Sequence, residues 1–375
     1  MNLELTEEQL ALRATVRRFL ADKAPVAGHV RPLLEDPTGT TDEVWLGLAR
    51  LGATGLLVPP EHGGAGMAMT DAGVVLEELG RALDPGPWQS TAVASVRALT
   101  RCAPGDEGTG APKLLRRIAE GSLVATVVLH DGTVAVAPGA HGTDDGAVVS
   151  GAVASVPDAA AASVLLVPGA DGSEHELFAV EASAPGVEIT PLRPVDGTRK
   201  RAALSFDGTP ARRLGPLGPE AVAALADDVL VASAADALGA AQAVLELAVD
   251  YAKVRTQFGA PIGSFQAVQH LCVDMLETVE LARSGVLQAL WAADHADPEQ
   301  RHLAALRCKA FSGRLAKVGD TAIQVFGGIG YTWEHDAHLY LKRLLSWSAR
   351  SGGPDRYLRE LGSRLVRSVQ ARGRP

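Results

Sequence analysis

The stretch YAKVRTQFGAPIGSFQAVQH, residues 251–270, joins the end of one predicted helix to the start of another through a polar turn. Arg255 closes the first helix, and Phe258 follows within the turn. A guanidinium offers a planar fork of donors that matches a pyrophosphate, and an aromatic ring can cover an adenine or ribose face. The stretch therefore predicts a nucleotide contact, although Arg255 by itself also fits a surface salt bridge.

Helical spacing of apolar residues continues on both sides of this stretch. A segment from Pro219 to 254 precedes it, and apolar stripes cover 264–292 and 301–325. Farther on, AIQVFGGIGYTWEHD, residues 322–336, places a group of glycines after a helix. A Rossmann fingerprint follows a strand, so these glycines do not predict one. They fit either a close backbone approach to a ligand or a plain helix-ending turn.

The first part of the chain is also helical, and the middle is not. Helices are expected over 6–20, 41–51 and 70–79, where apolar residues follow capping and acidic residues. Short Val-, Leu- and Ala-rich runs separated by Asp-Gly and Pro-Gly turns then predict an antiparallel sandwich or barrel. The runs are 123–129, 147–149, 163–167, 176–180 and 202–206.

The expected fold is therefore α+β and multidomain. It has an N-terminal helical domain at 1–118, a central antiparallel β domain at 119–212 and a C-terminal four-helix bundle at 213–375. This order limits the architecture without deciding the function.

Composition excludes several function classes. The net charge of −9 and the lack of a basic run argue against nucleic acid as a partner. No stretch approaches the roughly 20 apolar residues that a membrane span requires. The chain's three cysteines form neither a metal pattern nor a disulfide framework, so we expect no metal and a reduced, cytoplasmic protein.

Four motifs in order resemble the flavin-dependent acyl-CoA dehydrogenase family. They are LTEEQLALRATVRRFL at 5–20, GLLVPPEHGGAGMAMTDAGVVLEELGRAL at 55–83, and the two strings at 251–270 and 322–336. The resemblance implies FAD as cofactor and α,β-desaturation of an acyl-CoA thioester, with electrons passed to an electron-transfer acceptor protein. It also implies that the ADP half of FAD is held, commonly across a subunit interface, by the equivalents of Arg255, Gln257, Phe258, Ile262, Phe265, Gln266, Gln324, Gly327 and Gly328.

The family's catalytic glutamate is missing from both of its usual positions. These positions fall on Gly352 and Val229, and neither residue can act as a base. Asp228 is one residue away, which on a helix is a rotation of about 100°. Asp236 lies two turns beyond Val229 on nearly the same face. Asp236 is therefore the candidate base or substrate-positioning acid, and a packing role is its alternative.

The flavin-ring side of the family pattern is missing as well. The usual Thr-Glu-Pro-Gly loop corresponds here to 128–132, and the usual Trp-x-Thr strand corresponds to Ala154-Ser155-Val156-Pro157. Pro354 and Arg356 occupy positions after the lost glutamate that often contact flavin. The losses therefore lie on the side of the ring and thioester, while the ADP side is retained.

Three hypotheses follow. In the first, the chain resembles the supporting subunit of bacterial heterotetrameric acyl-CoA dehydrogenases, such as those of steroid side-chain degradation, and a homologous partner supplies the glutamate. In the second, it is a self-sufficient homotetramer that uses Asp236 on an acyl-CoA or acyl-carrier substrate. In the third, it is a non-catalytic structural homologue.

Overall fold

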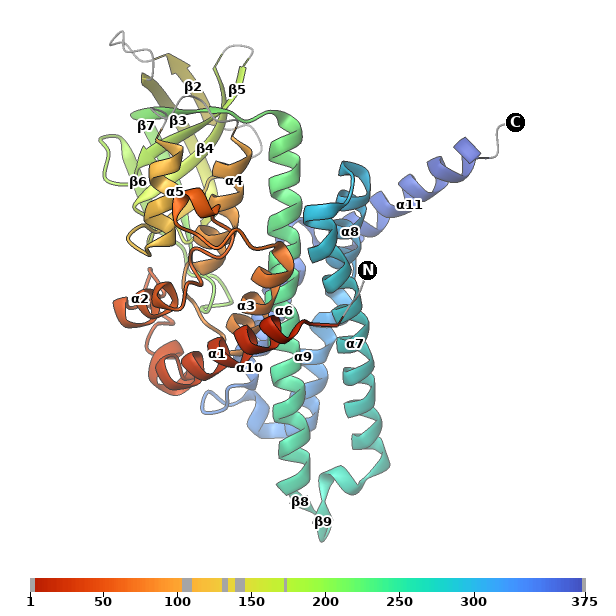
Figure 1. Cartoon of the computed structure of the whole chain (residues 1–375). Coiled ribbons are helices and arrows are strands. Elements are labelled where there is room, and N and C mark those ends of the chain that lie inside the picture. The colour runs from red at the N-terminus through yellow and green to blue at the C-terminus, as the bar shows by residue number, and fades with distance from the viewer. Residues whose placement is uncertain (1–3, 103–109, 130–133, 139–145, 172–173, 373–375) are drawn as a thin grey trace. The chain divides into compact units, whose positions relative to one another are not determined.

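A computed structural model describes residues 4–102, 110–129, 134–138, 146–171 and 174–372 of the chain (Figure 1). The chain forms two compact units: unit 1 comprises 1–14, 73–84 and 230–375, and unit 2 comprises 15–72 and 85–229. Helices α1 (Glu7–Lys23), α3 (Met69–Arg81) and α6 (Pro219–Val254) each contribute to both units. The order of helices, sheet and helices agrees with the expected fold class.

Unit 2 is built on a seven-stranded sheet in the order β1-β4-β5-β7-β3-β2, with β6 paired to β7. The strands are β1 (Ala125–Val127), β2 (Val134–Pro138), β3 (Gly146–Pro157), β4 (Val164–Asp171), β5 (Glu174–Glu181), β6 (Val187–Pro191) and β7 (Arg201–Pro216). The expectation of a wholly antiparallel sheet is wrong at one pair, because β1 runs parallel to β4. The long connection through β2 and β3 provides the crossover that a parallel pair requires.

One face of this sheet forms the core of unit 2. Burial alternates along β7, where Ala202, Leu204 and Phe206 are buried and their neighbours are partly exposed. This period of two places alternate side chains on opposite faces. The strands therefore pack one face tightly and leave the other open to a ligand or to water.

Short helices accompany the sheet in unit 2. They are α2 (Asp42–Arg50), α4 (Val96–Arg101) and α5 (Ala111–Ala119). Thr41 caps α2 by accepting from the backbone N–H of Val44, as its sequence predicts. Trp45 of α2 donates from Nε1 to the carbonyl oxygen of Gly121 at 2.7 Å, which ties α2 to the turn after α5.

Unit 1 is helical, as expected. Besides parts of α1, α3 and α6 it contains α7 (Gln266–His295), α8 (Pro298–Ala310), α9 (Ser312–Phe326), α10 (Ala337–Ala349) and α11 (Gly353–Arg372). The expectation of one helix over 301–325 is wrong, because Phe311 separates α8 from α9.

Two glycines let α3 and α6 approach closely in unit 1. A Cβ at Gly80 would overlap the carbonyl oxygen of Asp236, and a Cβ at Gly239 would overlap that of Glu77. Only glycine permits this separation of the two backbones. The crossing fixes the segment of α6 that carries Asp236.

The described residues contain neither a membrane-spanning helix nor a cluster of metal ligands. Among the helices in these ranges, none combines the length and apolar character needed to cross a bilayer. Within the same part of the chain, no three His, Cys, Asp or Glu side chains gather as a set of metal ligands.

Candidate functional site

The first predicted nucleotide segment is a small hairpin between α6 and α7. Its strands are β8 (Thr256–Gln257) and β9 (Ala260–Pro261), and Phe258 at its tip takes a φ of +52°. Phe258 is 96% exposed and meets Phe265 edge to face, with 6.2 Å between the ring centroids. The backbone N–H of Ile262 donates to the carbonyl oxygen of Arg255 at 2.7 Å. The segment 255–265 thus carries one guanidinium and two aromatic rings that contact each other.

The second predicted segment meets the first in unit 1. The ring of Tyr251, at the end of α6, lies 5.1 Å from that of Phe326, at the end of α9. Phe326 in turn lies 4.3 Å from the ring of His335, whose Nδ1 accepts from the backbone N–H of Ala337 at 3.1 Å. These contacts bring the Gly-rich turn and the hairpin to the same end of the helical bundle.

The glycines of the second segment leave open backbone, as the sequence predicts. They follow α9 directly, in the 3₁₀ turn Gly327–Tyr331, so the rejection of a Rossmann fingerprint is consistent with the structure. Gly327 has a φ of +63°, and no atom lies within 4 Å of a Cβ built at Gly327 or Gly328. A nucleotide can approach this backbone closely.

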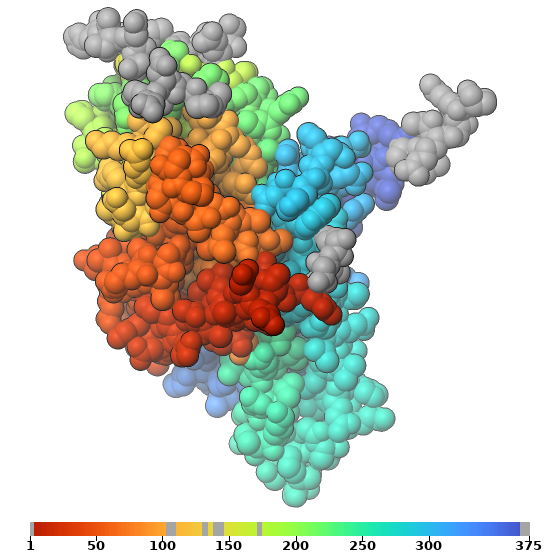
Figure 2. Space-filling view, viewed as in Figure 1, coloured from red at the N-terminus to blue at the C-terminus, as the bar shows by residue number. Residues whose placement is uncertain are grey.

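The candidate ADP contacts lie at the surface. Arg255, Gln257, Gln266 and Gln324 are exposed, and Figure 2 shows the end of the bundle formed by α6 and α7 in green and teal. The Arg255 guanidinium has no ion-pair or hydrogen-bond partner among the described residues, so the salt-bridge alternative finds no partner there. These donors and rings fit one side of an ADP group. They do not enclose it, so these residues form at most one side of a candidate nucleotide site.

A hollow of about 330 Å³ lies beside this half-site, between α6, the hairpin and α7. Its lining is mainly apolar and includes Val249, Ala252, Lys253, Pro261, Gly263, Val268, Gln269 and Cys272. The hollow places apolar surface next to the polar contacts, as a nucleotide site requires.

The position of the usual glutamate is an exposed turn with a left-handed backbone. Ser351, Gly352 and Gly353 have φ values of +60°, +100° and +67°. A Cβ at Gly352 would lie 2.7 Å from Cδ of Arg356. Tyr357 donates from its hydroxyl to the carbonyl oxygen of Ser351 at 2.9 Å and closes the turn. L-residues rarely take a φ of +100°, so this backbone disfavours a glutamate at 352.

The second usual position also lacks a free acid. Val229 is half-buried on α6. Its neighbour Asp228 is fully buried and points to α4, where its Oδ2 lies 3.4 Å from Nε of Arg97 and 2.5 Å from Nη1 of Arg101. Asp228 is therefore held in an ion-pair cluster within unit 2.

Asp236 is buried, and its carboxylate forms an ion pair with the guanidinium of Arg343. Arg343 of α10 donates from Nη2 to Oδ1 at 2.7 Å and from Nε to Oδ2 at 3.0 Å. Arg343 is 1% exposed and also donates to the carbonyl oxygen of Asp84 at 3.2 Å. Both carboxylate oxygens are thus used in tying α6 to α10. This geometry favours the packing alternative over a general base.

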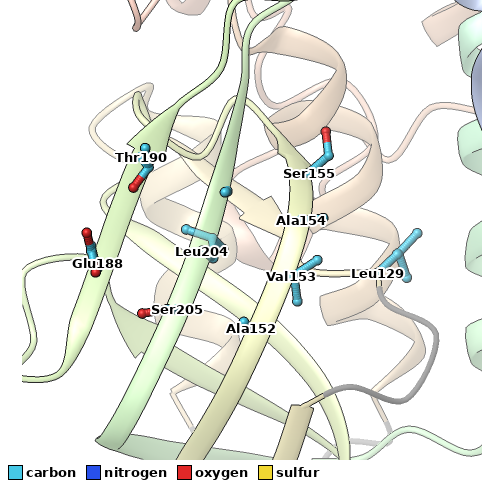
Figure 3. A pocket seen from close by; sticks show the side chains of 10 residues that line it. Leu129, Ala152, Val153, Ala154, Ser155, Glu188, Thr190, Leu204 and Ser205 are labelled. Atoms are coloured by element: carbon cyan, nitrogen blue, oxygen red, sulfur yellow. The ribbon is translucent and has the colours of Figure 1, made fainter.

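Leu129, Ala154 and Ser155, from the two segments expected on the flavin-ring side, border a hollow of about 670 Å³ on the open face of the sheet in unit 2 (Figure 3). It is lined by Leu129, Ala152, Val153, Ala154, Ser155, Glu188, Thr190, Ala203, Leu204 and Ser205. Arg201 donates to the carbonyl oxygen of Ser155 at 2.8 Å, which fixes the strand where a tryptophan is usual. Residues 130–132 of the corresponding loop lie outside the described residues. None of the described residues that line the hollow is aromatic.

Family models match both ends of the chain. Residues 6–102 match the model described as acyl-CoA dehydrogenase, N-terminal domain, and residues 231–365 match acyl-CoA dehydrogenase, C-terminal domain. Among curated proteins of Mycobacterium tuberculosis, acyl-CoA dehydrogenase FadE34 is 38% identical over 98% of this chain. Acyl-CoA dehydrogenase IpdE2 is 33% identical over 96% of this chain and 98% of its own length. The chain spans 49% of the length of FadE34.

Two solved structures show the same fold over nearly the whole chain. The Tcur3481-Tcur3483 steroid ACAD, solved as a glycine-to-alanine variant, is 29% identical with a TM-score of 0.86, over 97% of this chain and 99% of that one. The ChsE4-ChsE5 complex from Mycobacterium tuberculosis is 25% identical with a TM-score of 0.86, over 98% and 99%.

Proposed function

Because the chain belongs to the acyl-CoA dehydrogenase family, we propose that it serves as a subunit that lends the ADP half of a flavin site to a homologous partner. FAD, the cofactor expected from the sequence, is the cofactor of this family. The partner would supply the catalytic glutamate and the contacts to the flavin ring. Together the two subunits would desaturate an acyl-CoA thioester between its α and β carbons.

The observation that carries this proposal is the contrast between two parts of unit 1. The hairpin at 255–265 and the turn at 327–328 present exposed, unused contacts for an ADP group. The turn at 351–353 has no acid and a backbone that disfavours one. A half-site at a surface needs a second surface to close it, and a missing base needs a second chain to supply it.

In this scheme the chain's residues bind and orient the cofactor. Arg255 would neutralise the diphosphate through its donors, and Phe258 and Phe265 would cover the adenosine. Gln257, Gln266 and Gln324 would add neutral hydrogen bonds. When bound, FAD supplies the acceptor for the substrate's β-hydride, and the partner's carboxylate would take the α-proton.

The relatives support a heteromeric assembly and suggest a substrate class. One of the solved structures is named as a complex of two proteins, ChsE4 and ChsE5, and another as a steroid ACAD. We propose a heterotetramer that acts on a bulky, steroid-type acyl-CoA and passes electrons to an electron-transfer acceptor protein. The free thiols of Cys102, Cys272 and Cys308 are consistent with the cytoplasm as its compartment.

Purification of this chain alone and together with a glutamate-bearing homologue tests the proposal. The lone chain should hold little FAD and show no dehydrogenation, while the pair should hold FAD and turn over. Stoichiometric FAD and turnover in the lone chain would contradict the need for a partner. A flavin-free pair would instead favour the non-catalytic structural homologue.

A further inference from the structure

A cluster of three aromatic rings connects the two predicted nucleotide segments inside unit 1. Phe326 is 3% exposed and lies in the middle, with the ring of Tyr251 at 5.1 Å and that of His335 at 4.3 Å. The plane of the Phe326 ring is tilted by 52° to the first and by 51° to the second. Tilted rings avoid the unfavourable face-to-face arrangement of aromatic quadrupoles. We call Tyr251, Phe326 and His335 the aromatic cluster.

The Tyr251 end of the aromatic cluster is joined to the hairpin through the backbone. The N–H of Arg255 donates to the carbonyl oxygen of Tyr251 at 2.9 Å, so Arg255 lies one helical turn beyond this ring. A Cβ at Gly263 would lie 2.9 Å from the carbonyl oxygen of Ala252, so the turn after the hairpin packs closely on the last turns of α6. The position of Tyr251 therefore determines where Arg255 lies.

The Phe326 part of the aromatic cluster is joined to the glycine turn. The backbone N–H of Gly327 donates to the carbonyl oxygen of Gln324, so two predicted ADP contacts flank Phe326 in the chain. A Cβ at Gly330 would lie 3.0 Å from Cβ of Phe326, so the turn folds back closely over this residue. The position of Phe326 therefore determines where Gln324 and Gly327 lie.

We propose that the aromatic cluster is a positioning element that sets the spacing between Arg255 and the glycine turn, so that both contact the same ADP group. This role depends on the proposed function, because its ligand is the same FAD. Two contacts on one ligand reinforce each other only when their spacing matches the ligand. Tyr251 and Phe326 thus govern the affinity for FAD through the residues that they hold.

Substitutions at Tyr251 test this role, because the residue is half-buried at the edge of the aromatic cluster. Tyr251→Leu removes the ring, and Tyr251→Phe keeps the ring and removes only the hydroxyl. The chain is purified with its glutamate-bearing homologue, FAD is removed, and the complex is titrated with FAD while flavin fluorescence is followed. Tyr251→Leu should weaken FAD binding by about 10-fold, the upper end of what one aromatic contact contributes. Tyr251→Phe should bind FAD as the unchanged chain does.

Two further variants separate positioning from ordinary packing. Trp291→Leu removes a ring that stacks on His295 at 5.2 Å, about 37 Å along α7 from its first residue, and should leave FAD affinity unchanged. Phe326→Leu is combined with Tyr251→Leu in a double variant. If the two rings act as one element, the double variant should lose no more affinity than the more damaging single variant, whereas independent losses would multiply. Denaturation of each variant, measured in parallel, shows that the complexes compared are folded.

The outcome for Arg255→Ala in the same titration separates this inference from the proposed function. Unchanged FAD affinity in Tyr251→Leu, beside a loss in Arg255→Ala, would overturn the positioning role alone. Unchanged affinity in both would overturn the proposed function and the positioning role together. A loss in Tyr251→Phe as large as that in Tyr251→Leu would also overturn it, since the hydroxyl and not the ring would then be responsible.

Discussion

Replacing Asp236 with asparagine separates the two roles that this acid can have. Asp236 is 4% exposed, and its carboxylate receives two hydrogen bonds from Arg343, which is itself 1% exposed. Asparagine keeps the shape, removes the charge and turns an N–H₂ group toward a donor. The guanidinium would then be buried with its charge uncompensated.

The expected loss in the free energy of unfolding is about 3–5 kcal/mol, the range for removing one partner of a buried ion pair. Chemical denaturation followed by circular dichroism of the helices measures this loss. The dependence of the unfolding free energy on denaturant concentration, the m value, should be the same in both proteins, which checks that both unfold in the same transition. Asp250→Asn is the control, because Asp250 forms its ion pair with Lys253 at 2.8 Å with both side chains exposed. That control should give a change too small to resolve.

A double substitution completes the test. Asp236→Leu together with Arg343→Met removes both charges and should recover most of the loss, since apolar residues often replace a buried pair at little cost. A loss below about 1 kcal/mol for Asp236→Asn would refute the structural reasoning. If the same variant also abolished turnover with FAD still bound, the self-sufficient enzyme with Asp236 as its base would be supported.

Three further substitutions address the helix crossing, the turn and a buried lysine. Gly80→Ala should destabilise by about 1–3 kcal/mol through overpacking against α6, while Gly362→Ala, in open space, should stabilise by up to about 1 kcal/mol; equal effects in denaturation would contradict the close crossing. Gly352→Glu should restore no dehydrogenation to the lone chain, because a φ of +100° disfavours any side chain there; recovered turnover would show that the turn adapts. Burial lowers the pKa of Lys309 to about 8, so the unfolded chain binds a proton there that the folded chain lacks above that pH. Stability relative to Lys309→Met should therefore rise between about pH 8 and 10.5, and pH-independent denaturation midpoints would contradict this sign.

The local structure around the candidate ADP contacts could be predicted because it depends on short stretches of sequence, while their nucleotide role stays a prediction. Arg255 and Phe258 lie within a few residues of each other, and Gly327 follows directly on the end of α9. A helix end, a turn or an exposed glycine can each be predicted from a few consecutive residues. Only the structure shows that the two segments lie close together, through the contact between Tyr251 and Phe326.

The roles of the buried acids were not predictable in the same way. In the sequence Asp236 is an isolated acid in an apolar helix, and its partner Arg343 is 107 residues farther along the chain. Asp228 likewise finds Arg97 and Arg101 only because α4 packs against α6 within unit 2. Sequence spacing shows which face such an acid occupies, but the identity of a distant cation depends on the tertiary fold.

Two errors in the predicted elements have physical causes. The parallel pairing of β1 with β4 depends on where the intervening hairpin returns the chain, which alternation of residues does not encode. The division of 301–325 at Phe311 leaves the apolar stripe almost uninterrupted, because a single non-helical residue shifts the period very little.

The central claim is that this chain holds the ADP half of a flavin that reacts in its partner. The direct measurement is the FAD content of the purified complex when this chain carries Arg255→Ala. Because Arg255 is exposed and unpaired among the described residues, the substitution should leave the fold intact. The expected result is a complex of unchanged mass that has lost most of its FAD. A complex that retains full FAD and full turnover would contradict it.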